Sequence, residues 1–170
     1  LHLTGEQVFF GVAWPGDAWI PVVNYPWEAG DAVACGDALA RYLLTAMPDA
    51  AGYHLVSHSL GGRVLLEALK RLGRRAGQVC ITAGAVDSDC LATAYAPVKG
   101  KADRISVLAS KKDKVLWAAY PLGDFVSDVL LGDRDSPWRG ALGRRGPQPL
   151  EGAPVIHRQI PGGAGYDHGD

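Results

Sequence analysis

The chain has 170 residues, of which 48% are hydrophobic and 21% are charged, a composition typical of one compact domain with a sizeable core. Its 17 lysines and arginines against 18 acidic residues exclude the strongly basic surface of a nucleic-acid-binding domain. No apolar run approaches the roughly 20 residues of a membrane-spanning helix, so we expect a soluble protein.

The first part of the chain predicts a strand, a helix and a second strand. Val8–Ala13 is a short apolar run, and Trp14-Pro15-Gly16 ends it because proline cannot continue a strand ladder. Apolar residues at helical spacing predict a helix from about Asp31, its N-cap, to Met47, closed by Pro48. The second strand is expected at Tyr53–Val56.

The stretch His54–Leu72, HLVSHSLGGRVLLEALKRL, passes from a strand through a sharp turn into a helix. Ser59 stands at the turn, with Gly61 two residues later and Ser57 two residues earlier. This is the pattern of a nucleophile elbow, G-x-S-x-G, with a serine in place of the first glycine. We expect Ser59 to be a nucleophile and the Leu60 N–H to point toward a developing oxyanion.

The helix after Ser59 is predicted to be amphipathic. Its apolar face consists of Val64, Leu65, Ala68, Leu69 and Leu72, its polar face of Arg63, Glu67, Lys70 and Arg71, and Gly73 ends it.

Further strands follow this helix. They are expected at Gln78–Ala83, Arg104–Leu108 and Pro154–Ile160, with helical pieces in Val115–Leu131 and a loop over Arg134–Gly152. Strands that alternate with helices predict an α/β fold, a mostly parallel sheet flanked by helices on both faces. We find no repeat and no second domain, so residues 1–170 are expected to form a single domain.

The elbow and the run VFFGVAWPG resemble the α/β-hydrolase superfamily, and more narrowly lipase-like bacterial serine hydrolases. In those proteins a strand ending in Trp-Pro-small precedes an HS-[LM]-G elbow followed by RVLLEAL. The resemblance implies that an acid and then a histidine follow the serine, each in a loop after a strand. Asp113, after the strand Arg104–Leu108, is the implied acid, and Asp87 is the alternative.

Two histidines follow these acids in the chain. His168 lies beyond the last strand, where the histidine of the resembled family belongs, so it is the implied base. His157 lies within the strand and is expected to be a packed or half-buried structural histidine. His58 is expected to pack under the elbow and to face away from Ser59.

The resemblance implies cleavage of a carboxylic ester through an acyl-enzyme intermediate, with a small-molecule ester or acyl compound as substrate. The rival hypothesis is a non-catalytic α/β-hydrolase domain that binds a ligand or partner. Aromatic side chains available to line an acyl pocket are Trp14, Trp19, Trp27, Trp117 and Tyr120.

No cofactor is expected, because the chain contains neither nucleotide-binding glycine motif. No metal is expected either, because the residues that could supply oxygen and nitrogen ligands do not have the spacing of a metal motif. These residues are Asp87, Asp89, Asp167, His168 and Asp170. Three cysteines, Cys35, Cys80 and Cys90, are an odd number without metal spacing, which mildly favours the cytoplasm over secretion.

The resemblance also predicts a strand that this sequence lacks. If Val8–Ala13 is the fourth strand of the family's sheet, the third strand precedes Leu1, in an N-terminal extension that also carries a Gly-containing oxyanion loop. The alternative is a reduced sheet in which Val8–Ala13 pairs directly with Tyr53–Val56 and the Trp14-Pro15-Gly16 turn stands at the oxyanion position.

Overall fold

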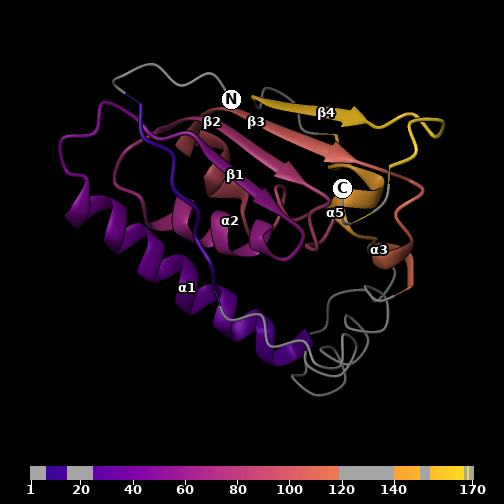
Figure 1. The fold of residues 1–170 in the computed structure, drawn as a ribbon, viewed down its shortest axis with the longest axis horizontal. Coiled ribbons are helices and arrows are strands. Elements are labelled where there is room, and N and C mark those ends of the chain that lie inside the picture. Colours follow the sequence, from indigo (N-terminus) through magenta and orange to yellow (C-terminus); the bar gives the residue numbers. More distant parts are fainter. Residues whose placement is uncertain (1–6, 15–24, 119–139, 150–153, 167, 169–170) are drawn as a thin grey trace.

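A computed structural model of the protein describes residues 7–14, 25–118, 140–149, 154–166 and 168 (Figure 1). Four strands form one parallel sheet in the order β1-β2-β3-β4: β1 (Leu55–His58), β2 (Ala76–Thr82), β3 (Ala102–Ala109) and β4 (Val155–Gln159). The predicted α/β class is confirmed. Because all four strands are parallel, their C-terminal ends lie at the same edge of the sheet, where loops can bring distant residues together.

The strands predicted from residue 53 onward are all present, with ends that differ by up to two residues. Their register brings apolar residues into line: Val79 of β2 pairs with Leu55 of β1 and Ile105 of β3, and Ile105 pairs with Val155 of β4. Val79 and Ile105 are buried and belong to the main hydrophobic core.

Helix α2 (Gly61–Arg71) packs between the sheet and helix α1 (Tyr25–Ala46). Its predicted apolar face is buried as expected, but Leu66 and Glu67 are buried too. Glu67 was placed on the polar face of the helix, and its burial was not predicted. Helix α1 covers that side of α2, which the periodicity of α2 alone does not reveal.

Helix α1 begins six residues before the predicted N-cap, so Asp31 lies inside the helix and that prediction is wrong. Pro26 stands in the first turn, where a missing N–H costs no helical hydrogen bond and the fixed φ favours helix formation. The helix ends at Ala46, two residues before Pro48, in agreement with the predicted stop.

Three short helices complete the described elements: η1 (Ala96–Lys101), α3 (Lys114–Ala118) and α5 (Leu142–Arg145). The loop predicted over residues 134–152 therefore contains a helical turn, in which buried Leu142 and Gly143 pack against the sheet. Helix α3 starts the predicted helical region 115–131, of which residues 119–131 lie outside the described ranges. No helix in the described ranges is long and apolar enough to cross a membrane.

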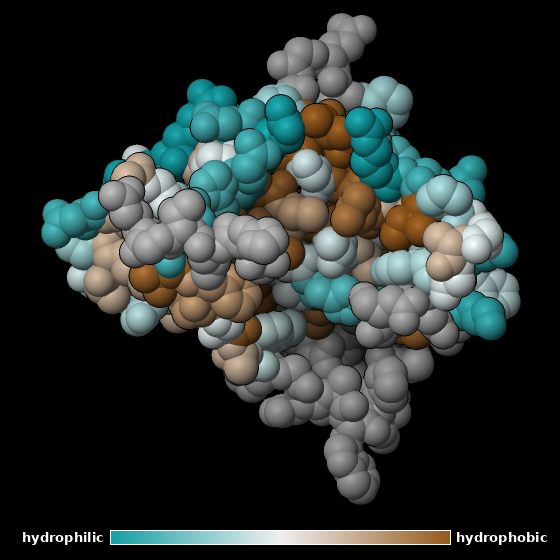
Figure 2. All heavy atoms as spheres, turned by 45° about the horizontal axis from the view of Figure 1, so that its top comes forward, coloured by the Kyte–Doolittle hydropathy of each residue, from teal (hydrophilic) through white to brown (hydrophobic). Residues whose placement is uncertain are grey.

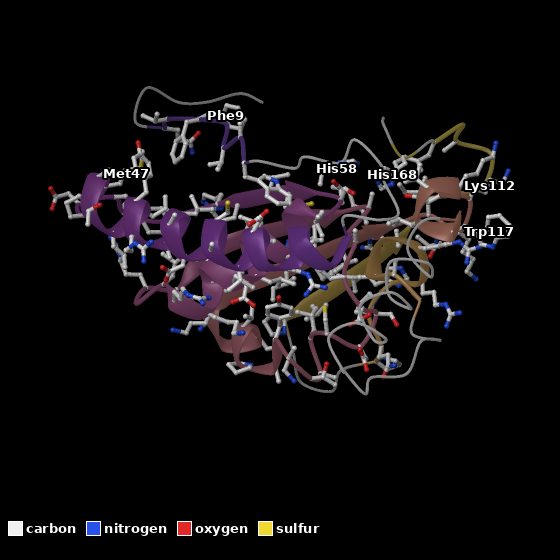
Figure 3. The ribbon with its side chains drawn as sticks, turned by 90° about the horizontal axis from the view of Figure 1, so that it is seen from below. Phe9, Met47, His58, Lys112, Trp117 and His168 are labelled. Atoms are coloured by element: carbon white, nitrogen blue, oxygen red, sulfur yellow. The ribbon has the colours of Figure 1, made fainter. Side chains whose placement is uncertain are left out.

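Helices α1 and α2 lie on one face of the sheet, α3 lies beyond the C-terminal ends of the strands, and the other face is open in the described part of the chain (Figures 1 and 3). On the open face Val56 is 73% exposed, and His58, Gln78 and Arg104 are exposed as well. The predicted helical cover is thus present on one face. Figure 2 shows hydrophobic residues gathered between hydrophilic ones on the visible surface.

The predicted strand at residues 8–13 is not formed, so that prediction is wrong. The segment instead lies against α1, where the rings of Phe10 and Tyr42 meet edge to face with centroids 5.9 Å apart. The direct pairing of 8–13 with 53–56 is absent too, and β1 has β2 as its one neighbour among the described strands. The N-terminal extension stays a prediction.

Candidate active site

Ser59 follows the last residue of β1 in a left-handed backbone conformation, with φ of 51°. Residues with a side chain rarely adopt this conformation, because Cβ crowds the following carbonyl group. Three backbone hydrogen bonds hold it: the Ser59 N–H donates to Thr82 (3.0 Å), and the Ser59 carbonyl accepts from Gly62 (3.0 Å) and Ala85 (3.1 Å). The turn between strand and helix thus has the strained, well-supported geometry expected of an elbow.

The small residues around Ser59 allow the strand and helix to approach closely. A Cβ on Gly62 would lie 3.3 Å from the Ile81 side chain, tighter than ordinary contact. A Cβ on Gly61 would lie 3.9 Å from the Cβ of Ser57, so the serine at the usual glycine position fits beside it. The Ser57 hydroxyl is nevertheless buried without a hydrogen-bond partner among the described residues.

The structure brings Ser59, Asp113 and His168 into one hydrogen-bonded chain, from loops that follow β1, β3 and β4. His168 Nε2 lies 3.0 Å from Ser59 Oγ, and His168 Nδ1 lies 2.7 Å from Asp113 Oδ2. Because a carboxylate only accepts, Nδ1 carries the proton and Nε2 is left to accept one from the serine hydroxyl. This arrangement can transfer the serine proton to the imidazole.

Asp113 is fully buried, and both of its carboxylate oxygens have donors. Oδ1 accepts from the Leu116 N–H at 2.8 Å, in the first turn of α3, while Oδ2 accepts from His168. The Asp113 N–H in turn donates to the Ser110 carbonyl at 3.1 Å. A buried carboxylate is stable only when it is hydrogen-bonded, and these contacts also fix its direction.

The Leu60 N–H stands at the N-terminus of α2 and donates no hydrogen bond within the described residues. It is available to an anion at the positive end of the helix dipole. Of the alternative oxyanion turn predicted at residues 14–16, positions 15 and 16 lie outside the described ranges.

A small apolar cluster lies around the three polar side chains. It consists of buried Ala83, Ala85, Leu116 and Ala141, against which Leu60 and Tyr166 pack. The sequence does not single out Tyr166, because a tyrosine in a Gly-rich loop gives no periodic signal. Beside it, a hollow of about 550 Å³ is lined by Ser110, Lys112, Lys114, Pro161, Gly162, Gly165 and Tyr166.

The aromatic residues predicted to line an acyl pocket do not converge in the described part of the chain. Trp117 on α3 is 64% exposed. Trp14 lines a separate groove of about 660 Å³ between residues 8–14 and α1. Trp19 and Tyr120 lie outside the described ranges, as does the side chain of Trp27.

The other candidate residues, His157, His58 and Asp87, are not part of the chain of hydrogen bonds from Ser59 through His168 to Asp113. His157 is exposed on β4 rather than half-buried, because β4 is an edge strand, and its ring lies over Gly146. His58 does not pack under the elbow, because the strand alternation turns its ring to the open face, beside His168. The backbone of Asp87 forms a bridge with Ala141.

The described residues contain no cluster of three histidine, cysteine or acidic side chains that could hold a metal ion. Two members of the candidate set, Asp167 and Asp170, lie outside the described ranges. The three cysteines are free thiols. Burial, the largest effect, raises the pKa of Cys90 to about 12, so this thiol is a poor nucleophile.

A family model described as "Alpha/beta hydrolase of unknown function (DUF900)" matches residues 2–139 of the chain. The match includes the elbow and Asp113 and ends before His168 in the sequence. No curated protein and no solved structure gives a significant match.

Proposed function

Because the chain belongs to this family of α/β hydrolases, we propose that it is a serine hydrolase that cleaves carboxylic esters through an acyl-enzyme intermediate. The observation that carries the proposal is the chain of hydrogen bonds from Ser59 through His168 to Asp113. These side chains come from three separate loops, so their alignment is not a by-product of local sequence.

In the proposed reaction Ser59 Oγ attacks the ester carbonyl while His168 Nε2 takes the hydroxyl proton. The imidazolium then donates that proton to the departing alcohol, which leaves an acyl group on Ser59. Asp113 holds the imidazole in the required tautomer and stabilises its positive charge. The Leu60 N–H donates to the negative oxygen that develops on the carbonyl.

Water completes the cycle by attacking the acyl group, with His168 acting again as base and then as acid. The partly exposed side chains of Leu60 and Tyr166, which pack on the apolar cluster, support an acyl compound as the substrate class, because they offer its apolar part an uncharged surface.

A fluorophosphonate probe tests the proposal, because it reacts only with an activated serine hydroxyl. We expect the wild type to be labelled at Ser59, and Ser59→Ala and His168→Ala to lose labelling and to lower ester turnover by roughly 10⁴-fold or more. Ser106→Ala, on the open face of β3, is the matched control and should react like the wild type. Absence of labelling in well-folded wild-type protein would favour a non-catalytic domain that binds a ligand or partner.

A further inference from the structure

His58, the last residue of β1, contacts the loop that carries His168. Its Nε2 lies 2.7 Å from the backbone carbonyl oxygen of His168, and the two imidazole rings stand with centroids 5.0 Å apart, tilted by 58° (Figure 3). A carbonyl oxygen only accepts hydrogen bonds, so His58 Nε2 carries the proton and donates it. The residue next to Ser59 in the chain thus holds the backbone of His168, while Asp113 holds its ring.

Lys112 contacts the same loop at its other end. Its ammonium donates to the carbonyl of Gly162 at 2.5 Å. The two residues are closely packed, because a Cβ on Gly162 would lie 3.0 Å from Lys112 Cε. Lys112 directly precedes the acid Asp113 in the sequence, just as His58 directly precedes the nucleophile Ser59.

Between the contacts of Lys112 and His58 the loop packs through Tyr166 against the small apolar cluster, but the residues before Tyr166 are open to solvent. Residues 161–165 are all exposed, and the chain passes through Gly165 with φ of 69°. Exposed segments with few buried contacts open locally at low free-energy cost. Proton transfer, in contrast, needs the base within about 0.5 Å of its productive position. Two charged or polar donors on carbonyl groups of the loop would supply that restraint.

We propose that His58 and Lys112 are positioning residues that clamp the loop between β4 and His168. Each extends from the segment that carries one partner of His168, so the clamp ties the base to both the nucleophile and the acid. The inference rests on the proposed function for its effect on turnover. Its effect on the position of His168 is independent of that function.

The test uses the proton that His168 Nδ1 shares with Asp113, which gives a far-downfield resonance in proton NMR when the bond is formed. We expect His58→Phe, which keeps a ring but loses the donor, to broaden or remove this resonance. It should also lower kcat for an ester about 10–100-fold with little change in KM, because a misplacement of about 1 Å has an effect of this size. His58→Gln, whose side-chain amide can donate from a similar position, should restore the resonance and kcat.

Lys112→Met should act in the same direction, Lys112→Arg should restore function, and Lys111→Met, at an exposed neighbouring position, is the matched control. Since both residues restrain one loop, the double variant His58→Phe/Lys112→Met should lose less than the product of the single effects. If His58→Phe and Lys112→Met keep the resonance and the turnover of the wild type, the clamp is wrong. If the wild type hydrolyses no ester but the resonance responds as expected, the proposed function fails and the clamp stands.

Discussion

In the described part of the chain two residues with side chains, Ser59 and Ala83, adopt left-handed backbone conformations, each directly after a strand of the sheet. Such residues cost on the order of 1–3 kcal/mol and persist where surrounding contacts force them. At Ser59 the conformation lifts the hydroxyl out of the strand, toward His168. At Ala83 it turns the chain so that the Ala85 N–H reaches the Ser59 carbonyl. The second strained residue therefore supports the first.

Ser57 tests how well the elbow tolerates a side chain at the usual glycine position. A buried hydroxyl without a partner costs about 1–3 kcal/mol of stability, so Ser57→Ala should leave the free energy of unfolding unchanged or raise it by about 1 kcal/mol. Urea denaturation of wild type and variant would measure this, with Ser106→Ala as the control. A loss of more than about 1 kcal/mol in Ser57→Ala would show that the hydroxyl binds a partner such as water.

Glu67 is a buried acid whose ionised form the fold favours. Burial by itself raises the pKa of this carboxyl, but hydrogen bonds from Arg71, Tyr95 and Lys70 outweigh that effect and hold the pKa below its ordinary 4.5. A lowered pKa in the folded state means that the carboxylate stabilises the fold above the unfolded value of about 4.5. That stabilisation is lost as the pH falls through the lower, folded value.

We therefore expect Glu67→Gln to lower the free energy of unfolding at neutral pH by about 1–3 kcal/mol, because Arg71 and Lys70 lose a charged acceptor. The difference from wild type should shrink as the pH is lowered below 4.5. Denaturation curves over this pH range would measure it. A difference that stays constant with pH would mean that lost packing, and not lost charge, causes the effect.

At the scale of elements, α1 and α2 approach so closely that one position has no room for a side chain. A Cβ on Gly36 of α1 would lie 2.5 Å from Glu67 Cβ and 2.7 Å from the Val64 carbonyl oxygen on α2. Glycine in a helix lowers stability by about 0.5–1 kcal/mol relative to alanine. At Gly36 this loss of stability is offset, because the close contact with α2 buries apolar residues of both helices.

Two glycines of α1 should therefore respond to alanine with opposite signs. Gly36→Ala forces the helices apart and should lower the free energy of unfolding by about 1–3 kcal/mol, as overpacking does. Gly30→Ala, with nothing within 4 Å of the added Cβ, should raise it by about 0.5–1 kcal/mol. Thermal denaturation of both variants would measure the pair. Equal stabilisation by both would contradict the close packing of α1 on α2.

At the scale of the whole molecule, the features that could be predicted from the sequence are those that local sequence patterns determine. Alternation and periodicity located the four strands and α2, and the chain order of serine, acid and histidine located Ser59, Asp113 and His168, which the structure brings together. Features that depend on packing between distant segments were not predictable. The burial of Glu67 requires α1, and the contact of His58 requires the loop after β4.

The segment at residues 8–13 was predicted wrongly for the same reason. Its composition favours a strand, but a strand forms only beside another strand, and this segment packs against α1 instead of the free edge of β1. Among the described strands β1 is an edge strand of a parallel sheet, a position where backbone groups can remain open to solvent or to another strand.

Hydrogen exchange tests this edge. Within β1, alternate residues direct their backbone groups to opposite sides, and the hydrogen bonds of Tyr53 and Ser59 with the β2 segment place odd-numbered residues toward β2. The Val56 N–H then points away from the sheet. We expect its amide to exchange much faster than those of Val79 and Ile105 in the two central strands, which open only with larger unfolding events. Protection of Val56 as strong as that of Val79 would mean that a further strand pairs with β1 in solution. A dependence of that protection on protein concentration would identify the partner as a second copy, and protection independent of concentration would assign it to a segment of the same chain.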